Sequence, residues 1–297
     1  MTWVVVGSSG QLGCALRKVL DQRKITHIDL ESKDLDIRSP EKCLSLITSI
    51  RPSVIINAAA WTDVDSAESD PFGAFAVNKE GALNLALAAK STNSIFVHIS
   101  TDYIFSGKQA QPWSETDIYT PISVYGRSKA EGEAAVLSVY PDKSYIFRTA
   151  WLYSRWRNNF AKTILRKAIT SSGEVRVVDD QVGQPTSAVD LAHQIVNSLK
   201  VNLPFGIYHA TNRGECSWFD FAIQVFRLSN EPISRIIPIK STDFFRAAAR
   251  PSYSVLGHKN WENCGDGGVK IPPMRDWQEA LKEEFPEILA NVLEESN

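Results

Sequence analysis

The chain has 297 residues, of which 22% are charged, and a formal net charge of −2 at pH 7. This length allows one large domain or two moderate ones. The sequence has no block of basic residues, which argues against a nucleic acid polymer as a partner. It also has no apolar run near the ~20 residues that a membrane-spanning helix needs, so no membrane partner is expected.

The start of the chain and its cysteines both bear on the compartment. The first expected strand starts at Trp3, which predicts that no signal peptide precedes the fold. The cysteines are far apart and form no CxxC pair, a pattern typical of free thiols in a reducing compartment rather than of a zinc site: Cys14, Cys43, Cys216 and Cys264. We therefore expect a cytoplasmic protein and no metal site.

Short apolar runs alternate with helical patterns through the first half of the chain. Residues 3–6 form the first expected strand, and a helix face follows with Leu12, Leu16, Val19 and Leu20. The same order continues, with strands expected at 25–30, 54–56, 95–99 and 144–147 and helices at 43–50, 72–89 and 126–139. Such alternation indicates right-handed βαβ units. The predicted fold is α/β, a Rossmann-like, doubly wound parallel sheet.

The second half of the chain shows a weaker alternation and more tryptophan, proline and loop signals. We assign residues 1–150 to a dinucleotide-binding domain and residues 151–297 mainly to a smaller, substrate-binding part. The apolar run Val175–Val178 indicates a strand. The chain is therefore expected to return to the sheet near residues 175–200.

Three glycines, Gly7, Gly10 and Gly13, lie between the first expected strand and the first expected helix. Glycine permits a tight turn and a close approach of the backbone to a pyrophosphate, whose charge then lies at the positive end of the helix. Strand-to-helix turns often carry glycine for packing alone, but this GxxGxxG spacing has the context of a dinucleotide-binding loop. The sequence therefore predicts NADPH or NADH as the cofactor.

Other candidates for cofactor contacts follow the second and third expected strands. Asp29 lies where a carboxylate can bond the adenosine ribose, although a solvated loop carboxylate is the alternative. Asp36 and Ile37 are candidates for the edge of the adenine. The small side chains after the third strand, among them Ala58 and Ala60, would let the backbone lie against the cofactor, although helix–sheet packing also explains them.

Tyr125 and Lys129 are four residues apart and share one face of an expected helix. A phenol with a pKa near 10 is a poor acid–base group at neutral pH, and a neighbouring ammonium lowers that pKa. Thr101 ends the fourth expected strand, and open α/β sheets bind ligands at the carboxyl ends of their strands. We therefore predict that Thr101 and Tyr125 meet over one substrate carbonyl. The alternative is an exposed helical pair.

Together these motifs resemble the extended short-chain dehydrogenase/reductase superfamily and, more narrowly, the dTDP-4-dehydrorhamnose reductase family. The segments that carry the narrower resemblance follow one another in the right order over nearly the whole chain: residues 51–65, 100–105, 124–129, 147–153, 159–160, 180–186, 206–209 and 250–251. The combination is far more specific than any single motif.

The resemblance implies reduction of dTDP-4-dehydro-L-rhamnose to dTDP-L-rhamnose, with Tyr125 as proton donor to the keto oxygen. Lys129 would lower the pKa of Tyr125 and bind the nicotinamide ribose, and Thr101 would hydrogen-bond the same oxygen. The remaining cofactor contacts that it implies are Gly10, Gln11 and Leu12 at the pyrophosphate, Asp29, Asp36 and Ile37 at the adenosine, and Ala60, Trp61 and Thr62 at the middle of the molecule.

On the substrate side, the resemblance implies contacts with a dTDP-sugar from Thr101, Asp102, Trp151, Asn159 and Arg250. Trp151 could instead be a core aromatic, and Arg250 a surface cation. The resemblance is compatible with a homodimer, and no residue here identifies a divalent cation between subunits.

Two segments depart from the family pattern, and both lie on the substrate side. Residues 243–249 read Asp-Phe-Phe-Arg-Ala-Ala-Ala where the family usually has a proline-rich stretch, and residues 154–157 read Ser-Arg-Trp-Arg, which is bulky and basic. These departures concern the identity of the sugar and of the base, not hydride transfer.

Two other functions compete with the reductase. An epimerase or dehydratase of the same superfamily would carry the same motifs, but a dehydratase normally has an acidic pair beside the catalytic hydroxyl, and Asp102 is followed here by Tyr103. A non-enzymatic subunit resembling the regulatory subunit of methionine adenosyltransferase could keep the fold as a scaffold. The intact Thr101, Tyr125 and Lys129 favour an enzyme.

Overall fold

The computed structural model describes residues 1–262 and 271–296, so the thiol expected at Cys264 lies outside the described residues. Six parallel strands form the central sheet in the order β10-β5-β4-β3-β1-β2. Their bounds are β1 (Trp3–Val6), β2 (His27–Leu30), β3 (Val54–Asn57), β4 (Ile95–Thr101), β5 (Ser144–Thr149) and β10 (Gly206–His209). The predicted Rossmann-like parallel sheet is thereby confirmed.

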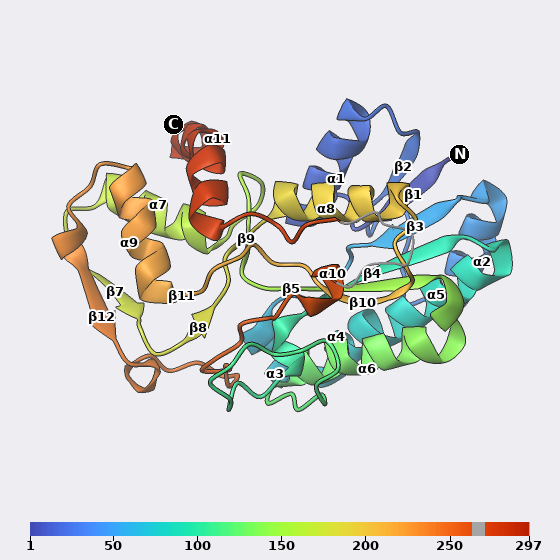
Figure 1. The fold of residues 1–297 in the computed structure, drawn as a ribbon, viewed down its shortest axis with the longest axis horizontal. Helices are drawn as coiled ribbons and strands as arrows, with labels where there is room; N and C mark the ends of the chain where they lie inside the picture. The colour runs from blue at the N-terminus through green and yellow to red at the C-terminus, as the bar shows by residue number, and fades with distance from the viewer. Residues whose placement is uncertain (263–270, 297) are drawn as a thin grey trace.

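Helices cover both faces of this sheet (Figure 1). One face packs against α1 (Gln11–Gln22) and α8 (Ala188–Lys200), and the other against α2 (Pro40–Ile50), α5 (Gly81–Thr92) and α6 (Val124–Val139). Because side chains alternate along a strand, Val5 belongs to the first apolar cluster and its neighbour Val4 to the second. The strands therefore read as continuous apolar runs, buried on both faces.

Short elements follow β3 and β4. After β3 come α3 (Val64–Ser69), α4 (Pro71–Phe75) and a π-helical turn over Ala76–Glu80 that leads into α5. A 3-10 turn (Asp102–Ile104) continues β4, and others cover Pro141–Lys143, Ile233–Arg235 and Ser241–Asp243. The single long helix predicted over 72–89 is thus three consecutive helical segments.

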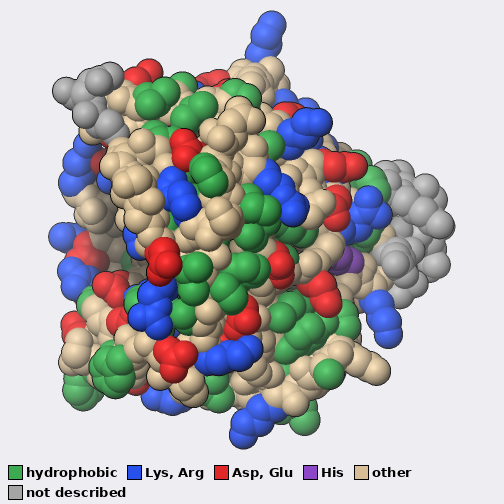
Figure 2. Space-filling view, turned by 90° about the vertical axis from the view of Figure 1, so that its left-hand side faces the viewer, with side chains coloured by type: hydrophobic (Ala, Val, Ile, Leu, Met, Phe, Trp, Pro, Cys, Tyr) green, Lys and Arg blue, Asp and Glu red, His purple; other side chains and the backbone are tan. Residues whose placement is uncertain are grey.

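A smaller lobe with its own apolar cluster stands beside the carboxyl ends of the strands (Figure 1). It contains α7 (Phe160–Thr170), α9 (Trp218–Leu228) and α11 (Trp277–Ser296), with the strand pair β7 (Val175–Val178) and β12 (Ile236–Ile239). Further short elements are β6 (Leu152–Tyr153), β8 (Val182–Gly183), β9 (Thr186–Ser187), β11 (Cys216–Ser217) and α10 (Lys259–Glu262). On its outer face, hydrophobic, basic and acidic side chains are interspersed (Figure 2).

The predicted return of Val175–Val178 to the central sheet is wrong. The segment is a strand, as expected, but it pairs in parallel with β12 in a separate two-stranded sheet. Apolar periodicity identifies a strand without identifying its partner. The return is made by α8, which packs against α1, and by β10, which pairs with β5.

The strand order reverses between β1 and β3, which creates a crevice where ligands of doubly wound sheets bind. The loops after β1, β3 and β4 all open into it. Three cysteines in the described part of the chain, Cys14, Cys43 and Cys216, are free thiols, as the sequence predicts. No helix among residues 1–262 and 271–296 is both long and apolar enough to span a membrane.

Candidate active site

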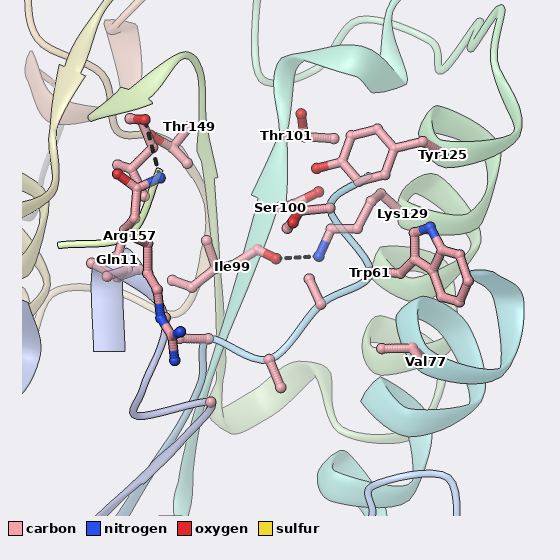
Figure 3. Close-up of a pocket in the computed structure, with 18 of the residues that line it drawn as sticks. Gln11, Trp61, Val77, Ile99, Ser100, Thr101, Tyr125, Lys129, Thr149 and Arg157 are labelled. Carbon is pink, nitrogen blue, oxygen red and sulfur yellow. Dashed lines mark hydrogen bonds between the residues drawn. The ribbon is translucent and has the colours of Figure 1, made fainter. Parts of the chain in front are cut away.

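A cavity of about 990 Å³ lies at the carboxyl ends of the strands, between the sheet and the lobe. It gathers most of the predicted site, from the glycine loop after β1 to the helix face of Tyr125 and Lys129 and the loop at Trp151. Figure 3 shows Thr101, Tyr125 and Lys129 on one side of this space and Gln11 and Arg157 on the other. Sequence spacing alone could not bring these two sides together.

The glycine loop has no room for side chains at two of its three glycines. Gly7 has φ +80°, and a Cβ there would lie 2.6 Å from the backbone nitrogen of Ala59. A Cβ on Gly13 would lie 2.3 Å from the carbonyl oxygen of Gly7, so this glycine serves close helix packing and does not line the cavity. Gly10 is the N-cap of α1 without any side-chain cap, which leaves backbone N–H groups directed at the cavity. The loop therefore fits a pyrophosphate.

At the adenosine end, one expected residue, Asp29, does not line the cavity. Asp29 lies within β2 opposite Val5, and its Oδ2 forms an ion pair with Arg17 Nε of α1 at 2.8 Å instead of lining the cavity. The cavity begins two residues later, beyond the end of the strand, where Glu31 and Ser32 line it. Of the two carboxylates, Glu31 lines the cavity and Asp29 does not.

Asp36 and Ile37 do line this end of the cavity, as predicted. Asp36 accepts two hydrogen bonds from the Arg38 side chain, at 2.8 and 2.9 Å, and these hold the pKa of its carboxyl down, to about 2. Ile37 is buried and packs against Gly81 of α5. Among the other predicted cofactor residues, Leu12, Ala58, Ala60, Trp61 and Thr62 line the same space.

Tyr125 and Thr101 meet over the centre of the cavity, as the spacing of their motifs predicts (Figure 3). Thr101 Oγ1 donates to Asp102 Oδ1 at 2.9 Å. Burial raises the pKa of Tyr125 to about 12, and the neighbouring Thr101 hydroxyl offsets part of that rise. The phenol is therefore fully protonated at neutral pH, the state that an acid requires.

Lys129 lies one helical turn beyond Tyr125, and its Nζ donates to the carbonyl oxygen of Ile99 at 2.5 Å. Burial lowers the pKa of this ammonium to about 8, while the carboxylate of Glu133 acts to raise it. Lys129 thus keeps most of its charge at pH 7. In the protein alone, burial rather than Lys129 dominates the pKa of Tyr125.

Asp102 is a buried carboxyl in the same cavity, and one of its oxygens, Oδ2, has no hydrogen-bond partner. Burial raises its pKa to about 6. A buried oxygen without a partner costs free energy, and a hydroxyl that bonded to it would offset that cost.

Sequence reasoning missed Asn78, which lies in the π-helical turn and is buried. Its Oδ1 accepts from the Trp61 backbone N–H at 2.9 Å, and its Nδ2 donates to Trp61 O at 3.1 Å and to Ser128 Oγ at 2.9 Å. It thereby ties the loop after β3 to α6, beside Lys129. A π-turn is a common device at functional sites, but no local pattern in the sequence marks it.

Trp151 faces a neighbour that the sequence did not predict. Its indole stacks on Trp218, the first residue of α9, with 3.5 Å between ring centroids and 9° between planes. A Cβ on Gly183 would lie 2.6 Å from the Trp151 ring, and Trp151 itself has φ +45°. Its indole is therefore held between Trp218 and the Gly183 backbone. Trp218 lines the cavity as well.

Arg250 lines a second cavity of about 660 Å³, which adjoins the first at Tyr103, Phe160 and Trp218. Its Nη1 and Nη2 donate to the two carboxylate oxygens of Asp65 on α3, at 2.6 and 2.7 Å. These bonds hold the pKa of Asp65 well below its usual range. Both ends of the Arg250 fork are thus already used by Asp65.

Asn159 also has protein partners for its amide. It is the N-cap of α7, and its Nδ2 donates to Gln11 Oε1 at 3.0 Å and to Ser154 O at 2.7 Å. Gln11 in turn donates to Leu152 O at 3.4 Å. The structure therefore places Asn159 as a link between the lobe and the glycine loop.

Comparisons with known proteins agree with this geometry. A family model described as the RmlD substrate binding domain matches residues 1–289. The chain is 42% identical over 288 residues to a dTDP-4-dehydrorhamnose reductase of Streptomyces griseus, covering 96% of this chain and 93% of that protein. It is 39% identical over 284 residues to a dTDP-4-keto-6-deoxy-D-glucose reductase of Streptomyces niveus, covering 96% of each.

A solved structure has a similar fold as well as a similar sequence. A dTDP-4-dehydrorhamnose reductase from Bacillus anthracis, in complex with NADP, superposes with a TM-score of 0.90 at 36% identity, covering 96% of this chain and 99% of that one. These matches confirm the resemblance carried by the motifs. The chain belongs to the dTDP-4-dehydrorhamnose reductase family.

Proposed function

We propose that this protein reduces dTDP-4-dehydro-L-rhamnose to dTDP-L-rhamnose, with NADPH or NADH as cofactor. The observation that carries the proposal is that Thr101 and Tyr125, with Lys129 one helical turn beyond Tyr125, line the same cavity as the glycine loop. This arrangement suits transfer of a proton to a keto oxygen. The family's named reductases support the choice of reaction.

In this proposal Tyr125 is the acid. A bound reduced nicotinamide supplies hydride to the keto carbon. The Tyr125 phenol, whose pKa burial raises to about 12, protonates the oxygen on which charge develops, and the Thr101 hydroxyl helps to hold that oxygen. The positive charge of Lys129 stabilises the phenolate that remains and can hold a ribose hydroxyl.

The remaining cofactor contacts are proposed from the cavity lining. Gly7, Gly10 and Gln11 would hold the pyrophosphate together with Leu12, at the positive end of α1. The adenosine end would lie between Glu31 and Ile37, and the backbone at Ala58–Thr62 would face the middle of the molecule.

The nucleotide of the substrate would lie in the second cavity, because its lining carries three cations besides Arg250: Lys167, Arg176 and Arg246. Cations of this kind pair with a diphosphate. Tyr103 and Trp218 line both cavities, so the sugar would lie between them, over Tyr125. Asp102, through its unpartnered Oδ2, would accept from a sugar hydroxyl. In this position the sugar meets Trp218 and the edge of Trp151, not a free indole face.

Two observations disfavour the competing functions. Tyr103 follows Asp102 where a dehydratase normally has a second acidic residue, and its ring packs edge-on against Tyr125 at 5.6 Å. A scaffold has no need of a fully assembled Thr101, Tyr125 and Lys129. The Streptomyces niveus relative is named for a different 4-keto sugar, so the identity of the sugar is the narrower part of the proposal.

Cofactor consumption separates these functions. With dTDP-4-dehydrorhamnose and NADPH, the purified protein should bleach the nicotinamide absorbance one for one with sugar consumed. An epimerase would convert the sugar without net bleaching, and a scaffold would do neither. If the absorbance fell only with a different keto-sugar nucleotide, the reductase activity would be supported and the assignment of the rhamnose substrate would be wrong. The setting that we propose is the cytoplasm, where nicotinamide cofactors and nucleotide sugars are both found.

A further inference from the structure

The loop between β6 and α7, residues 154–159, crosses from the lobe to the glycine loop, and we refer to it as the strap. Ser154 Oγ and Asn159 Nδ2 both donate to Gln11 Oε1 at 3.0 Å. Arg157 Nε donates to the carbonyl oxygen of Ser9 at 2.7 Å. The strap is therefore attached to the glycine loop at Ser9 and at Gln11.

Arg157 holds an unfavourable backbone conformation at this place. Its φ is +56°, in the left-handed region, where a residue with a Cβ is disfavoured and glycine is not. Strain of this kind persists only where the surroundings fix it, and it occurs often at ligand clamps. The chain thus keeps a long cation at a position whose backbone favours glycine.

The end of the Arg157 side chain is free for a ligand. Within residues 1–262 and 271–296, the bond from Nε to Ser9 is its one side-chain hydrogen bond, and no carboxylate pairs with the guanidinium. The residue lines the main cavity together with Gly10 and Gln11 (Figure 3). A guanidinium of this kind binds phosphate oxygens through its forked donors.

A second positive group faces the same space. Gly10 is the N-cap of α1 and has no side-chain cap, and the residues at this helix end, Gly10, Gln11 and Leu12, line the cavity. Arg157 and this helix end therefore flank one position at the tip of the glycine loop. A phosphate group bound at this position would meet both positive groups.

We propose that Arg157 binds the diphosphate of the dinucleotide and that the strap closes the pyrophosphate site from the lobe side. The proposal rests on the dinucleotide binding proposed above. It assigns a binding role to the bulky, basic segment that departs from the family pattern. Its effect is on cofactor affinity, not on the chemistry at Tyr125.

Calorimetric titration of the whole protein tests this with NADPH, NADH, ADP-ribose and dTDP as separate probes. Arg157→Gly removes the guanidinium and suits the positive φ, so the variant should fold with an unchanged or higher melting temperature. We expect Kd to rise about 10-fold for NADPH, NADH and ADP-ribose alike, because each contains the diphosphate. The Kd for dTDP should stay within 2-fold.

The matched control is Arg155→Ala in the same strap. The Arg155 guanidinium stacks on Trp156 and pairs with Glu287 of α11 at 3.5 Å, and it does not line the cavity. All four Kd values should therefore stay within 2-fold in Arg155→Ala. Arg157→Lys, which keeps the charge without the fork, should fall between wild type and Arg157→Gly.

Other outcomes overturn the assignment. Loss confined to NADPH would place Arg157 at a 2′-phosphate, and loss confined to dTDP would place it at the substrate diphosphate. Unchanged affinities in Arg157→Gly would leave it without a binding role. Wild-type protein that binds none of the dinucleotide probes would instead refute the proposed function, so the two failures are distinguishable.

Discussion

The two sides of the main cavity are built differently. On the sheet side, Thr101 ends a central strand, and Tyr125 and Lys129 lie on a helix packed against the sheet, so secondary structure fixes all three. On the lobe side, Trp151 and Arg157 lie in loops, Trp151 stacked on Trp218 and Arg157 bound to the carbonyl oxygen of Ser9, and Arg250 lines the adjoining second cavity, bound to Asp65. We infer that the sheet side sets the reaction and the lobe side sets affinity. Substitutions on the two sides should therefore change different kinetic constants.

The largest expected effect is on the sheet side. Tyr125→Phe removes the group placed to protonate the oxygen, and general acid catalysis is typically worth about 100- to 10,000-fold in rate. We expect kcat to fall within that range while the Kd for NADPH, measured by fluorescence, stays near wild type. A Tyr125→Phe variant with a normal kcat would contradict the claim that the sheet side sets the reaction.

The pH dependence of the wild-type rate tests the roles of Tyr125 and Lys129 on the sheet side. Tyr125 stays protonated well above neutral pH, because burial raises its pKa to about 12. Lys129 loses its charge as the pH rises through about 8, since burial lowers its pKa. Reduction should therefore decline above pH 8 through loss of the Lys129 charge, before the phenol itself ionises.

The sequence predicts the sheet side better than the lobe side, because secondary structure fixes the first and long-range contacts fix the second. Tyr125, Lys129 and Thr101 occur at fixed positions on predicted elements, so their meeting follows from the topology of a parallel sheet. Asn78 and Trp218 could not be predicted in this way, because their roles come from contacts with residues far away in the chain: Asn78 with Ser128, and Trp218 with Trp151.

Two wrong or altered expectations have related causes. The strand at Val175–Val178 was recognised, but periodicity does not select a partner strand. Arg250 was expected to contact the dTDP-sugar, and in the structure its fork is bound to Asp65, a residue 185 positions away. In both cases the local pattern was read correctly and the long-range partner was not available from it.

A smaller effect is expected at the contact between the two sides. Asp65 on α3 binds Arg250 and the backbone N–H of Ala248, and so fixes the loop that lines the second cavity. Asp65→Asn keeps the shape but loses the charge, and partly exposed pairs of this kind are worth roughly 1–2 kcal/mol. We expect about a 10-fold higher KM for the sugar nucleotide, with little change in kcat or in the Kd for NADPH.

A double-mutant cycle shows whether that loss belongs to the ion pair. If Asp65 acts through Arg250, then Asp65→Asn combined with Arg250→Gln should raise KM no further than the worse single variant. Additive losses would mean that Arg250 contacts the substrate independently. A fall in kcat as large as the rise in KM would contradict the division of roles between the two sides.

The smallest expected effect distinguishes two carboxylates only two residues apart. Glu31 lines the adenosine end of the cavity, whereas Asp29 is bound to Arg17 and lies outside it. A carboxylate near the ribose repels a 2′-phosphate, and the partly exposed Glu31, with Lys33 at 3.4 Å, should do so by only about 1 kcal/mol. Glu31→Gln should therefore raise the preference for NADPH over NADH about 3- to 5-fold, measured as the ratio of the two kcat/KM values.

Asp29→Asn is the matched control. It weakens the contact with Arg17 and should lower the melting temperature slightly, but it should leave the cofactor ratio within 2-fold of wild type. If the ratio shifted in Asp29→Asn and not in Glu31→Gln, the second strand would present its earlier carboxylate to the ribose, and the lining found after β2 would be wrong.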